Sequence, residues 1–125
     1  MKILESAENY LETILMLSQK LQHVRSVDIA TELNYSKPSV SVAMKKLREN
    51  DLISVDSDGF ITLTESGREI AEKMYERHRL LSDCLTYLGV SEETALEDAC
   101  RIEHVISEES FERIRQHVLE MRKHL

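Results

Sequence analysis

Residues 26–47 read SVDIATELNYSKPSVSVAMKKL, and this stretch decides the fold. The apolar residues of its first third recur at helical spacing, which predicts a short helix capped by Ser26. The dipeptide YS marks a tight turn. A second helix then follows, with Ser36 or Lys37 near its N-cap and Pro38 in its first turn, where proline is tolerated. The stretch therefore predicts two helices joined by a tight turn.

The flanking segments extend this pattern on both sides. Residues 5–20, ESAENYLETILMLSQK, repeat apolar side chains at helical spacing, with Ser6 as the expected N-cap. After the second helix the period changes, and residues 52–55 and 60–63 are typical of two short strands joined by a DSDG turn. Helix, short helix, tight turn, helix and two-stranded hairpin is the order of a winged helix-turn-helix, whose third helix is the recognition helix.

The rest of the chain is predicted to be helical. Thr64 caps a long helix that runs to about Leu88 and is ended by Gly89, Ser91 caps the next helix, and Ser107 caps the last. The last helix has apolar residues at heptad-like spacing, and the helix before it adds further apolar positions. Together they predict a homodimer. The apolar seam of the last helix comprises Phe111, Ile114, Val118, Met121 and Leu125, and the preceding helix adds Leu96, Ala99 and Val105. The predicted fold class is mainly α, with an N-terminal winged helix-turn-helix, a two-stranded β wing and a following helical region.

The composition limits the class of protein. The chain has 125 residues, of which 42% are hydrophobic and 31% charged, enough for one compact domain or two small ones sharing a core. It has no apolar run of membrane-spanning length and begins without a signal-peptide core, so we expect a cytoplasmic protein with no membrane partner. In that compartment Cys84 and Cys100 should be reduced thiols. The net charge of −7 argues against a protein that coats nucleic acid non-specifically, but it allows a local basic surface.

Such a surface is predicted on the recognition helix, because residues 34–48 hold four cations and no acid. Hydroxyl groups, an exposed apolar side chain that could meet a thymine methyl group, and lysines for phosphate or guanine are all suited to reading DNA. The predicted DNA-binding residues are Ser36, Lys37, Pro38, Ser39, Ser41, Val42, Lys45 and Lys46. The alternative is a solvated face of an ordinary helical domain. The wing tip carries Asp56 and Asp58, so it should not press against phosphates.

A second pattern indicates a metal site. In DACRIEHVIS, residues 98–107, the side chains of Cys100, Glu103 and His104 would share one face of a helix. A thiolate, a carboxylate and an imidazole on one turn suit a metal ion better than they suit a core. Three ligands leave the shell of an octahedral ion incomplete, so other elements must contribute.

Three residues elsewhere are candidates for completing this site. Asn9 and Glu12 lie three apart on the first helix, and His78 lies on the apolar stripe of the long helix. Alone, His78 would be a core histidine and Glu12 a solvated carboxylate. Together with the Cys-Glu-His turn they favour a metal site, because buried carboxylates and a thiolate need a compensating cation. Cys84 has no such neighbours and is interpreted as a core thiol.

The segments ENYLETILML, SVDIATELNYSKPSVSVAMKKL, LTESGREIAEKMYERHRLL and EDACRIEHVIS resemble successive blocks of the diphtheria toxin repressor / manganese transport regulator family. The resemblance runs from about Ser6 to Val118, and its specific motifs are the HRLL segment at His78 and the Cys-x-x-Glu-His turn. It implies a metal-dependent repressor that binds palindromic operator DNA as a homodimer. It also implies a DNA-binding domain in residues 1–63 and a metal-binding and dimerisation domain in residues 64–125. Because the chain ends at Leu125, it resembles the short form without an SH3-like domain.

The resemblance carries the family's ligands over unevenly. His78, Glu103 and His104 match metal-binding positions in both branches of the family, and Glu12 matches a carboxylate of the manganese branch. Cys100 stands where the iron branch has cysteine and the manganese branch has glutamate. The predicted site is therefore a hybrid of the two branches.

Other positions match neither branch. Asn9 stands where the manganese branch has aspartate and the iron branch methionine. Ser82 and Leu96 replace two further ligands of the iron branch, so that branch's ancillary site is not expected.

The predicted metal ligands are Glu12, His78, Cys100, Glu103, His104 and Asn9. A thiolate prefers iron, cobalt, nickel or zinc to manganese, so we expect Fe²⁺ as the signal, Mn²⁺ as the alternative, and Zn²⁺, Co²⁺ or Ni²⁺ as ions that bind in vitro.

The expected function is a metal-dependent transcriptional repressor that controls iron or manganese uptake and is not an enzyme. One alternative is a winged-helix regulator that senses a small organic ligand without metal. Another is a metalloenzyme, since cysteine, glutamate and histidine can hold a hydrolytic zinc. The enzyme hypothesis lacks a glycine-rich loop or a nucleophile motif and leaves the recognition helix unexplained.

Overall fold

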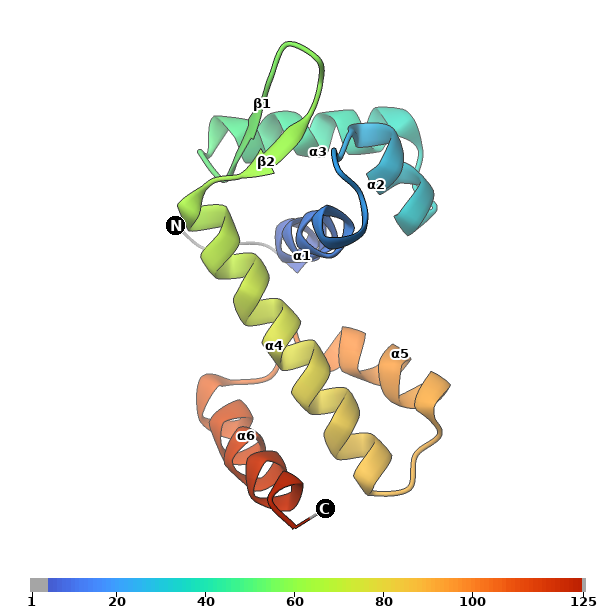
Figure 1. The fold of residues 1–125 in the computed structure, drawn as a ribbon, viewed down its shortest axis with the longest axis vertical. Coiled ribbons are helices and arrows are strands. Elements are labelled where there is room, and N and C mark those ends of the chain that lie inside the picture. Colours follow the sequence, from blue (N-terminus) through green and yellow to red (C-terminus); the bar gives the residue numbers. More distant parts are fainter. Residues whose placement is uncertain (1–4, 125) are drawn as a thin grey trace. The chain divides into compact units, whose positions relative to one another are not determined.

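A computed structural model describes residues 5–124, and this part of the chain forms six α-helices and one β-hairpin (Figure 1). The chain divides into two compact units, Met1–Lys73 and Met74–Leu125, and each is described by itself. The division falls within the long helix α4, Glu65–Tyr87. The functional domain boundary expected after residue 63 stays a prediction.

The first unit is the winged helix-turn-helix predicted from the order of the elements (Figure 1). Its elements are α1 (Glu5–Lys20), α2 (Ser26–Leu33), α3 (Lys37–Glu49), β1 (Ile53–Val55) and β2 (Ile61–Leu63). The two strands pair antiparallel, with Ile53 opposite Leu63 and Val55 opposite Ile61. The first part of α4 completes the unit. The predicted fold class is thereby confirmed.

Short-range hydrogen bonds set the start of α3. The Ser36 hydroxyl accepts a hydrogen bond from the backbone N–H of Ser39, and Pro38 occupies the first turn, as predicted. Asn34 adopts the left-handed conformation, with φ of 57°, and so turns the chain sharply between α2 and α3. These local features, more than tertiary contacts, make the helix-turn-helix readable from sequence.

Two predicted caps are wrong. Ser26 is the first residue of α2 and does not cap it; Arg25 occupies the N-cap, and its backbone N–H donates to Oδ2 of Asp28 at 2.9 Å. The acid three residues into the helix thus replaces the expected serine hydroxyl. Ser6 lies inside α1, which begins at Glu5, so the position of its N-cap falls outside the described residues.

The inner side of α3 belongs to the core of the first unit. Val40, Met44 and Leu47 are buried, and α3 packs on α2 and β1. Gly67, in the first turn of α4, lies against the backbone of Leu52, the residue before β1. A Cβ atom added to Gly67 would lie 2.0 Å from the Leu52 carbonyl oxygen. Thr64 caps α4 as predicted, because its hydroxyl oxygen accepts the N–H of Gly67 at 3.1 Å. The close contact between Gly67 and Leu52 joins the start of the wing to the start of α4.

The tip of the wing is the predicted DSDG turn. Oδ1 of Asp56 accepts the backbone N–H groups of Asp58 and Phe60, both at 2.9 Å, and Gly59 has a φ of 81°. The exposed Asp56 and Asp58 carboxylates therefore lie at the end of a well-defined turn. At its base, the Phe60 ring stacks on His23 with 4.1 Å between ring centroids.

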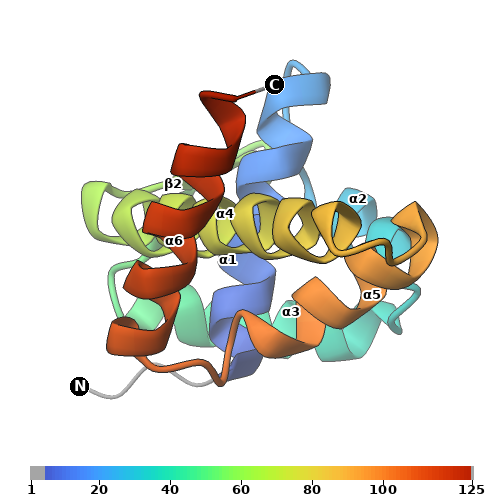
Figure 2. The same cartoon turned by 90° about the horizontal axis from the view of Figure 1, so that it is seen from below.

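The second unit contains the rest of α4, α5 (Glu92–Ile102) and α6 (Glu108–Arg122) (Figure 2). Ser91 and Ser107 cap α5 and α6 as predicted. The buried core comprises Leu80, Leu81, Ala99, Phe111 and Val118. All three helices contribute to this core, so the second unit has a hydrophobic core of its own.

Two ion pairs hold α6 against α4. Nε of Arg115 lies 3.2 Å from Oε1 of Glu76, and about two helical turns further along each helix Arg122 pairs with Asp83. The hydrogen bond to Asp83 raises the pKa of the Arg122 guanidinium above its usual range. These pairs anchor α6 independently of the loop that precedes it.

The apolar seam of α6 is used largely within the subunit. Phe111 and Val118 are buried in its own core, as is Ala99, so these three side chains stabilise the subunit itself. Leu96 and Val105 are exposed at 43% and 74%. Leu125 falls outside the described residues. No helix in the described part of the chain is long and apolar enough to cross a membrane.

Candidate metal centre and nucleic-acid interface

The Cys-Glu-His motif straddles the end of α5. The helix ends at Ile102; Glu103 occupies the C-cap position, with its N–H donating to the Ala99 carbonyl at 3.0 Å, and His104 lies in the turn that follows. The prediction that one helical turn carries all three side chains is therefore wrong. Cys100 is exposed, whereas Glu103 is fully buried.

The structure does bring His78, Glu103 and His104 together within the second unit. Nδ1 of His78 lies 3.2 Å from Oε2 of Glu103, and Nε2 of His104 lies 3.4 Å from Oε1 of the same carboxylate. The His104 side chain is 3% exposed and that of His78 19%. A buried carboxylate thus stands between two imidazoles, one from α4 and one from the turn after α5.

The hydrogen bonding of this cluster is incomplete. Neither oxygen of Glu103 has a hydrogen-bond partner, nor does Nδ1 of His78, although all three atoms are buried. The separations between the imidazole nitrogens and the carboxylate oxygens are within the range of ion pairs. A buried carboxylate without hydrogen bonds is costly, and a cation satisfies it. Imidazole nitrogens and carboxylate oxygens are ordinary ligands for divalent transition metals, so the cluster fits such an ion.

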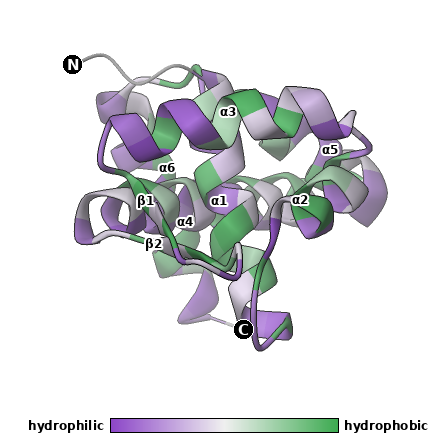
Figure 3. Ribbon diagram, turned by 90° about the horizontal axis from the view of Figure 1, so that it is seen from above, coloured by the Kyte–Doolittle hydropathy of each residue, from purple (hydrophilic) through white to green (hydrophobic). Residues whose placement is uncertain are grey.

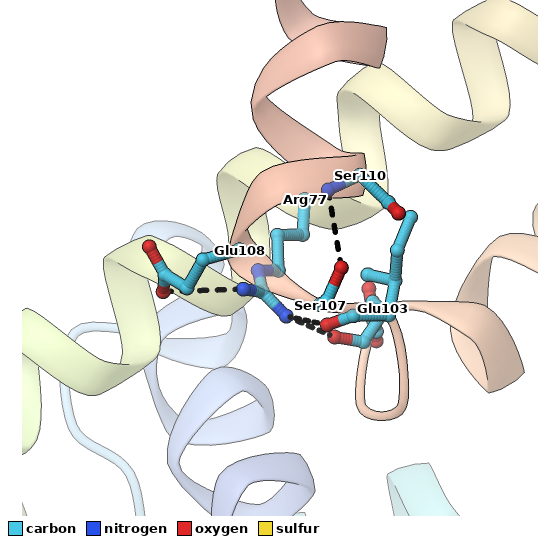
Figure 4. A network of polar contacts seen from close by, with 6 residues as sticks. Arg77, Glu103, Ser107, Glu108 and Ser110 are labelled. Carbon is cyan, nitrogen blue, oxygen red and sulfur yellow. Dashed lines mark hydrogen bonds and ion pairs between the residues drawn. The ribbon is translucent and has the colours of Figure 1, made fainter.

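Arg77 is part of this cluster, and sequence reasoning missed it. Its side chain is buried, and Nη1 donates to the carbonyl oxygens of Glu103 at 3.0 Å and Ile106 at 3.1 Å (Figure 4). Nη2 donates to Oε1 of Glu108 at 3.3 Å. The one available signal was its place beside His78 in the ERHRLL segment, but an arginine in a charged helix is ordinarily a surface residue.

The remaining predicted ligands lie in different environments. Glu12 is buried in α1 and Asn9 is half-buried one turn before it, and both belong to the first unit. Cys84 is half-buried beside the core of the second unit, and burial raises the pKa of its thiol. That environment agrees with its interpretation as a core thiol. Ser82 is buried and donates to the Arg79 carbonyl at 3.1 Å.

The predicted DNA-binding residues lie together on the outer side of α3 and at its N-cap. All of them are exposed; they are Ser36, Lys37, Pro38, Ser39, Ser41, Val42, Lys45 and Lys46. Figure 3 shows α3 carrying both strongly hydrophilic and hydrophobic residues along its length. Val42 is 55% exposed between hydroxyl and ammonium groups. The Ser36 hydroxyl also bonds Ser39, at 2.8 Å, so these two serines have a capping role as well.

Two family models together match nearly the whole chain. The N-terminal DNA binding domain of iron dependent repressors matches residues 2–59, and their metal binding and dimerisation domain matches residues 64–124. The chain belongs to the iron dependent repressor family. The resemblance stated from the sequence motifs is thereby confirmed, and so is the assignment to metal-dependent transcriptional repressors.

Individual relatives agree with this family assignment. The iron dependent repressor described here is 34% identical over 113 residues to an uncharacterised HTH-type transcriptional regulator of Methanocaldococcus jannaschii, covering 89% of this chain and 90% of that one. It is 35% identical over 111 residues to the transcriptional regulator MntR of Escherichia coli O6:H1, covering 89% and 72%. A solved structure described as a manganese-dependent transcriptional repressor in complex with manganese matches with a TM-score of 0.83 and 31% identity. That match covers 90% of this chain and 52% of the other, so this chain spans about half of the longer protein.

Proposed function

We propose that this iron dependent repressor binds palindromic operator DNA as a homodimer when it is loaded with a divalent transition metal, and that it represses genes for iron or manganese uptake. The observation that carries the proposal is the buried Glu103 carboxylate, which stands between His78 and His104 without a hydrogen-bond partner. The exposed hydroxyl and ammonium groups of α3 supply a surface suited to base edges and phosphates.

We further propose the ligands. When bound, a divalent cation supplies a positive charge that compensates the buried Glu103 carboxylate. His78 and His104 contribute imidazole nitrogens and Glu103 contributes carboxylate oxygen, while Cys100 offers its thiolate or its backbone carbonyl. Glu12, with Asn9, contributes oxygen from α1. Because α1 belongs to the DNA-binding unit, ligands from both units would tie the metal-binding region to the region that reads DNA.

This connection gives metal-dependent DNA binding a physical basis. The two recognition helices of a dimer must match successive major-groove half-sites, roughly 34 Å apart. Fixing α1 through Glu12 restricts the positions that α3 can adopt. Metal and DNA then favour the same arrangement, and each tightens the binding of the other by about 1–3 kcal/mol.

Ferrous iron is the proposed signal and Mn²⁺ the alternative. The Cys100 thiol is softer than the carboxylates, which favours Fe²⁺, Co²⁺, Ni²⁺ or Zn²⁺, and Asn9 lacks the charge that a hard Mn²⁺ ion prefers. The solved manganese-dependent repressor complex supports the alternative. Cys100→Glu tests the choice: under anaerobic conditions it should improve the Mn²⁺ response of DNA binding relative to that with Fe²⁺. Unchanged selectivity would remove the Cys100 thiolate from the set of ligands that determine metal choice.

A metal titration of DNA binding tests the function itself. Chelator-treated protein is titrated with Fe²⁺, Mn²⁺ or Zn²⁺ in the presence of a labelled palindromic duplex, and binding is followed by fluorescence anisotropy. The repressor predicts binding gated by metal. Binding independent of metal would favour the sensor of a small organic ligand, and turnover of a hydrolysable substrate would favour a metalloenzyme. A cytoplasmic location belongs to the same proposal, and the relatives named as transcriptional regulators support a protein that is not an enzyme.

A further inference from the structure

The candidate ligands of the second unit come from two segments, a long helix and a turn. His78 lies within α4, a helix of 23 residues, whereas Glu103 and His104 lie at the end of α5 and in the turn that leads to α6. The backbone hydrogen bonds of the turn are local and do not reach α4: the N–H groups of Val105 and Ile106 both donate to the Ile102 carbonyl at 3.0 Å. Ile102 and Ile106, at its two ends, pack against the core of the unit, and a polar contact adds to this attachment.

Arg77 provides that contact (Figure 4). Its Nη1 atom bridges the carbonyl oxygens of Glu103 and Ile106, one at each end of the turn, and Nη2 reaches Glu108 at the start of α6. The guanidinium carbon also lies 5.2 Å from the centroid of the Phe111 ring. One planar group thus joins α4, the turn and the first residues of α6. A lysine could not reproduce this, because its ammonium group lacks the fixed fork of donors.

Arg77 immediately precedes His78 on α4, so the backbone fixes the two residues relative to each other. The bond from Arg77 to the Glu103 carbonyl therefore fixes the Glu103 backbone relative to His78. We propose that Arg77 is a positioning residue that holds the turn carrying Glu103 and His104 against α4 before any metal binds. The inference rests on the proposed function, since it assigns Arg77 a role toward the same metal site. Groups that orient metal ligands in this way typically contribute 10- to 100-fold to metal affinity.

A purely structural role for Arg77 would be to dock α6. The second unit does not need Arg77 for that, because Arg115 pairs with Glu76 and Arg122 pairs with Asp83 further along the helix. The core residues Phe111 and Val118 add to this anchorage. Loss of the Arg77 contacts should therefore loosen the turn and leave most of α6 in place.

The experiment compares Arg77→Lys with the wild type in two measurements. Affinity for Zn²⁺ and Mn²⁺ is measured by competition with a chromophoric chelator, and amide hydrogen exchange is measured on the metal-free protein. We expect a 10- to 100-fold loss of metal affinity. We also expect faster exchange at Val105 and Ile106, with exchange in the middle of α6 unchanged. The second measurement does not depend on metal, and a role limited to docking α6 would not produce that pattern.

Two variants serve as matched controls. Arg115→Lys alters another arginine of the α4–α6 contact that does not bond the turn, and it should leave metal affinity unchanged. Glu108→Gln removes the charge from one Arg77 partner whose side chain is 75% exposed and leaves the two carbonyl bonds in place, so its effect should be less than threefold.

A second route covers the case in which Arg77→Lys does not fold. Val105→Gly raises the chain entropy of the turn at a position that is 74% exposed in the single chain, and Val105→Ala controls for the lost side chain, including any contact it makes in a dimer. Glycine should lower metal affinity about two- to fivefold relative to alanine. Equal affinity of the two variants would overturn the inference.

The outcomes separate this inference from the proposed function. Wild-type metal affinity in Arg77→Lys, or a loss of protection that spreads over α6, would overturn the positioning role while leaving the metal-dependent repressor intact. Failure of the wild-type protein to bind any of these ions would overturn the proposed function, and the positioning role with it.

Discussion

Nδ1 of His78 lies 3.2 Å from Oε2 of Glu103, and both atoms are buried without a hydrogen-bond partner. Oε1 of the same carboxylate, on the side of His104, has no hydrogen-bond partner either. Burying such a group lowers the stability of the metal-free protein. Affinity for a cation and a less stable apoprotein therefore have the same structural cause.

Glu103→Gln should separate these two consequences. The amide has the shape of the carboxylate but no charge, so the metal-free variant should be more stable than the wild type, by about 1–3 kcal/mol. The rise in melting temperature that Zn²⁺ or Mn²⁺ gives the wild type should be lost. Thermal unfolding with and without metal measures both effects.

Glu97→Gln is the matched control for this prediction, because Glu97 is an exposed residue of α5. It should change neither the stability of the apoprotein nor the metal-induced shift. A metal-free Glu103→Gln protein less stable than the wild type would mean that the carboxylate is already well compensated without metal.

Lys45→Ala should weaken operator binding and reduce its dependence on salt. Lys45 is exposed on the outer side of α3, and each phosphate contact that is lost lowers the slope of log K against log salt by about 0.9. Titrations of metal-loaded protein at several salt concentrations give the slope. Lys123→Ala removes the same charge at the C-cap of α6 and should leave the slope unchanged. Equal slopes for both variants would exclude a Lys45–phosphate contact.

Gly67→Ala should destabilise the protein even though alanine is the better helix former. Propensity alone predicts a gain of about 1 kcal/mol, but the added Cβ would stand 2.0 Å from the Leu52 carbonyl oxygen. The junction between the wing and α4 would have to open, at a cost of about 1–3 kcal/mol. Chemical denaturation measures the change, and Ser66→Ala, at an exposed position of the same turn, should have little effect. A stabilised Gly67→Ala protein would show that the junction yields easily.

The two thiols should differ in their reaction with iodoacetamide. Burial raises the pKa of the Cys84 thiol, so at a given pH less of the reactive thiolate is present, and the side chain is half-buried as well. Cys100 is exposed and should be alkylated first, as mass spectrometry of the digested protein can show. If the Cys100 thiolate is a ligand, Fe²⁺ or Zn²⁺ will slow its alkylation. Equal rates with and without metal would leave only the backbone carbonyl of Cys100 as a candidate.

Much of the fold could be predicted because its signals are local. Ser36, Ser91 and Ser107 each cap a helix through a hydrogen bond three residues along the chain, and the change to a period of two at the wing needs no distant contact. Ser26 misled the prediction because Asp28, inside α2, bonds the N–H of Arg25 instead. The choice between these two neighbouring caps depends on small energy differences that composition does not reveal.

The candidate site was predictable in its residue types and less so in its arrangement. Glu103 and His104 were recognised from their motif, but periodicity alone extended α5 beyond Ile102 and gave Cys100 the same surroundings as Glu103. Arg77 was missed because its burial depends on carbonyl groups 26 and 29 residues away in sequence. A helical pattern reports which side of a helix is apolar, and it contains no information about backbone oxygens that a distant turn brings to that helix.

The Asp56 and Asp58 carboxylates at the wing tip have a consequence for the search for an operator. A repressor must find its site among roughly 10⁶ or more competing sequences. Positive charge on the protein would bind it to the phosphates of all of them. With an acidic wing tip and a net charge of −7, this chain should attract DNA only weakly wherever α3 makes no favourable contact. The residence time of the protein on unrelated sequences should therefore be short. Discrimination would come as much from weak attraction to the rest of the genome as from strong attraction to the operator.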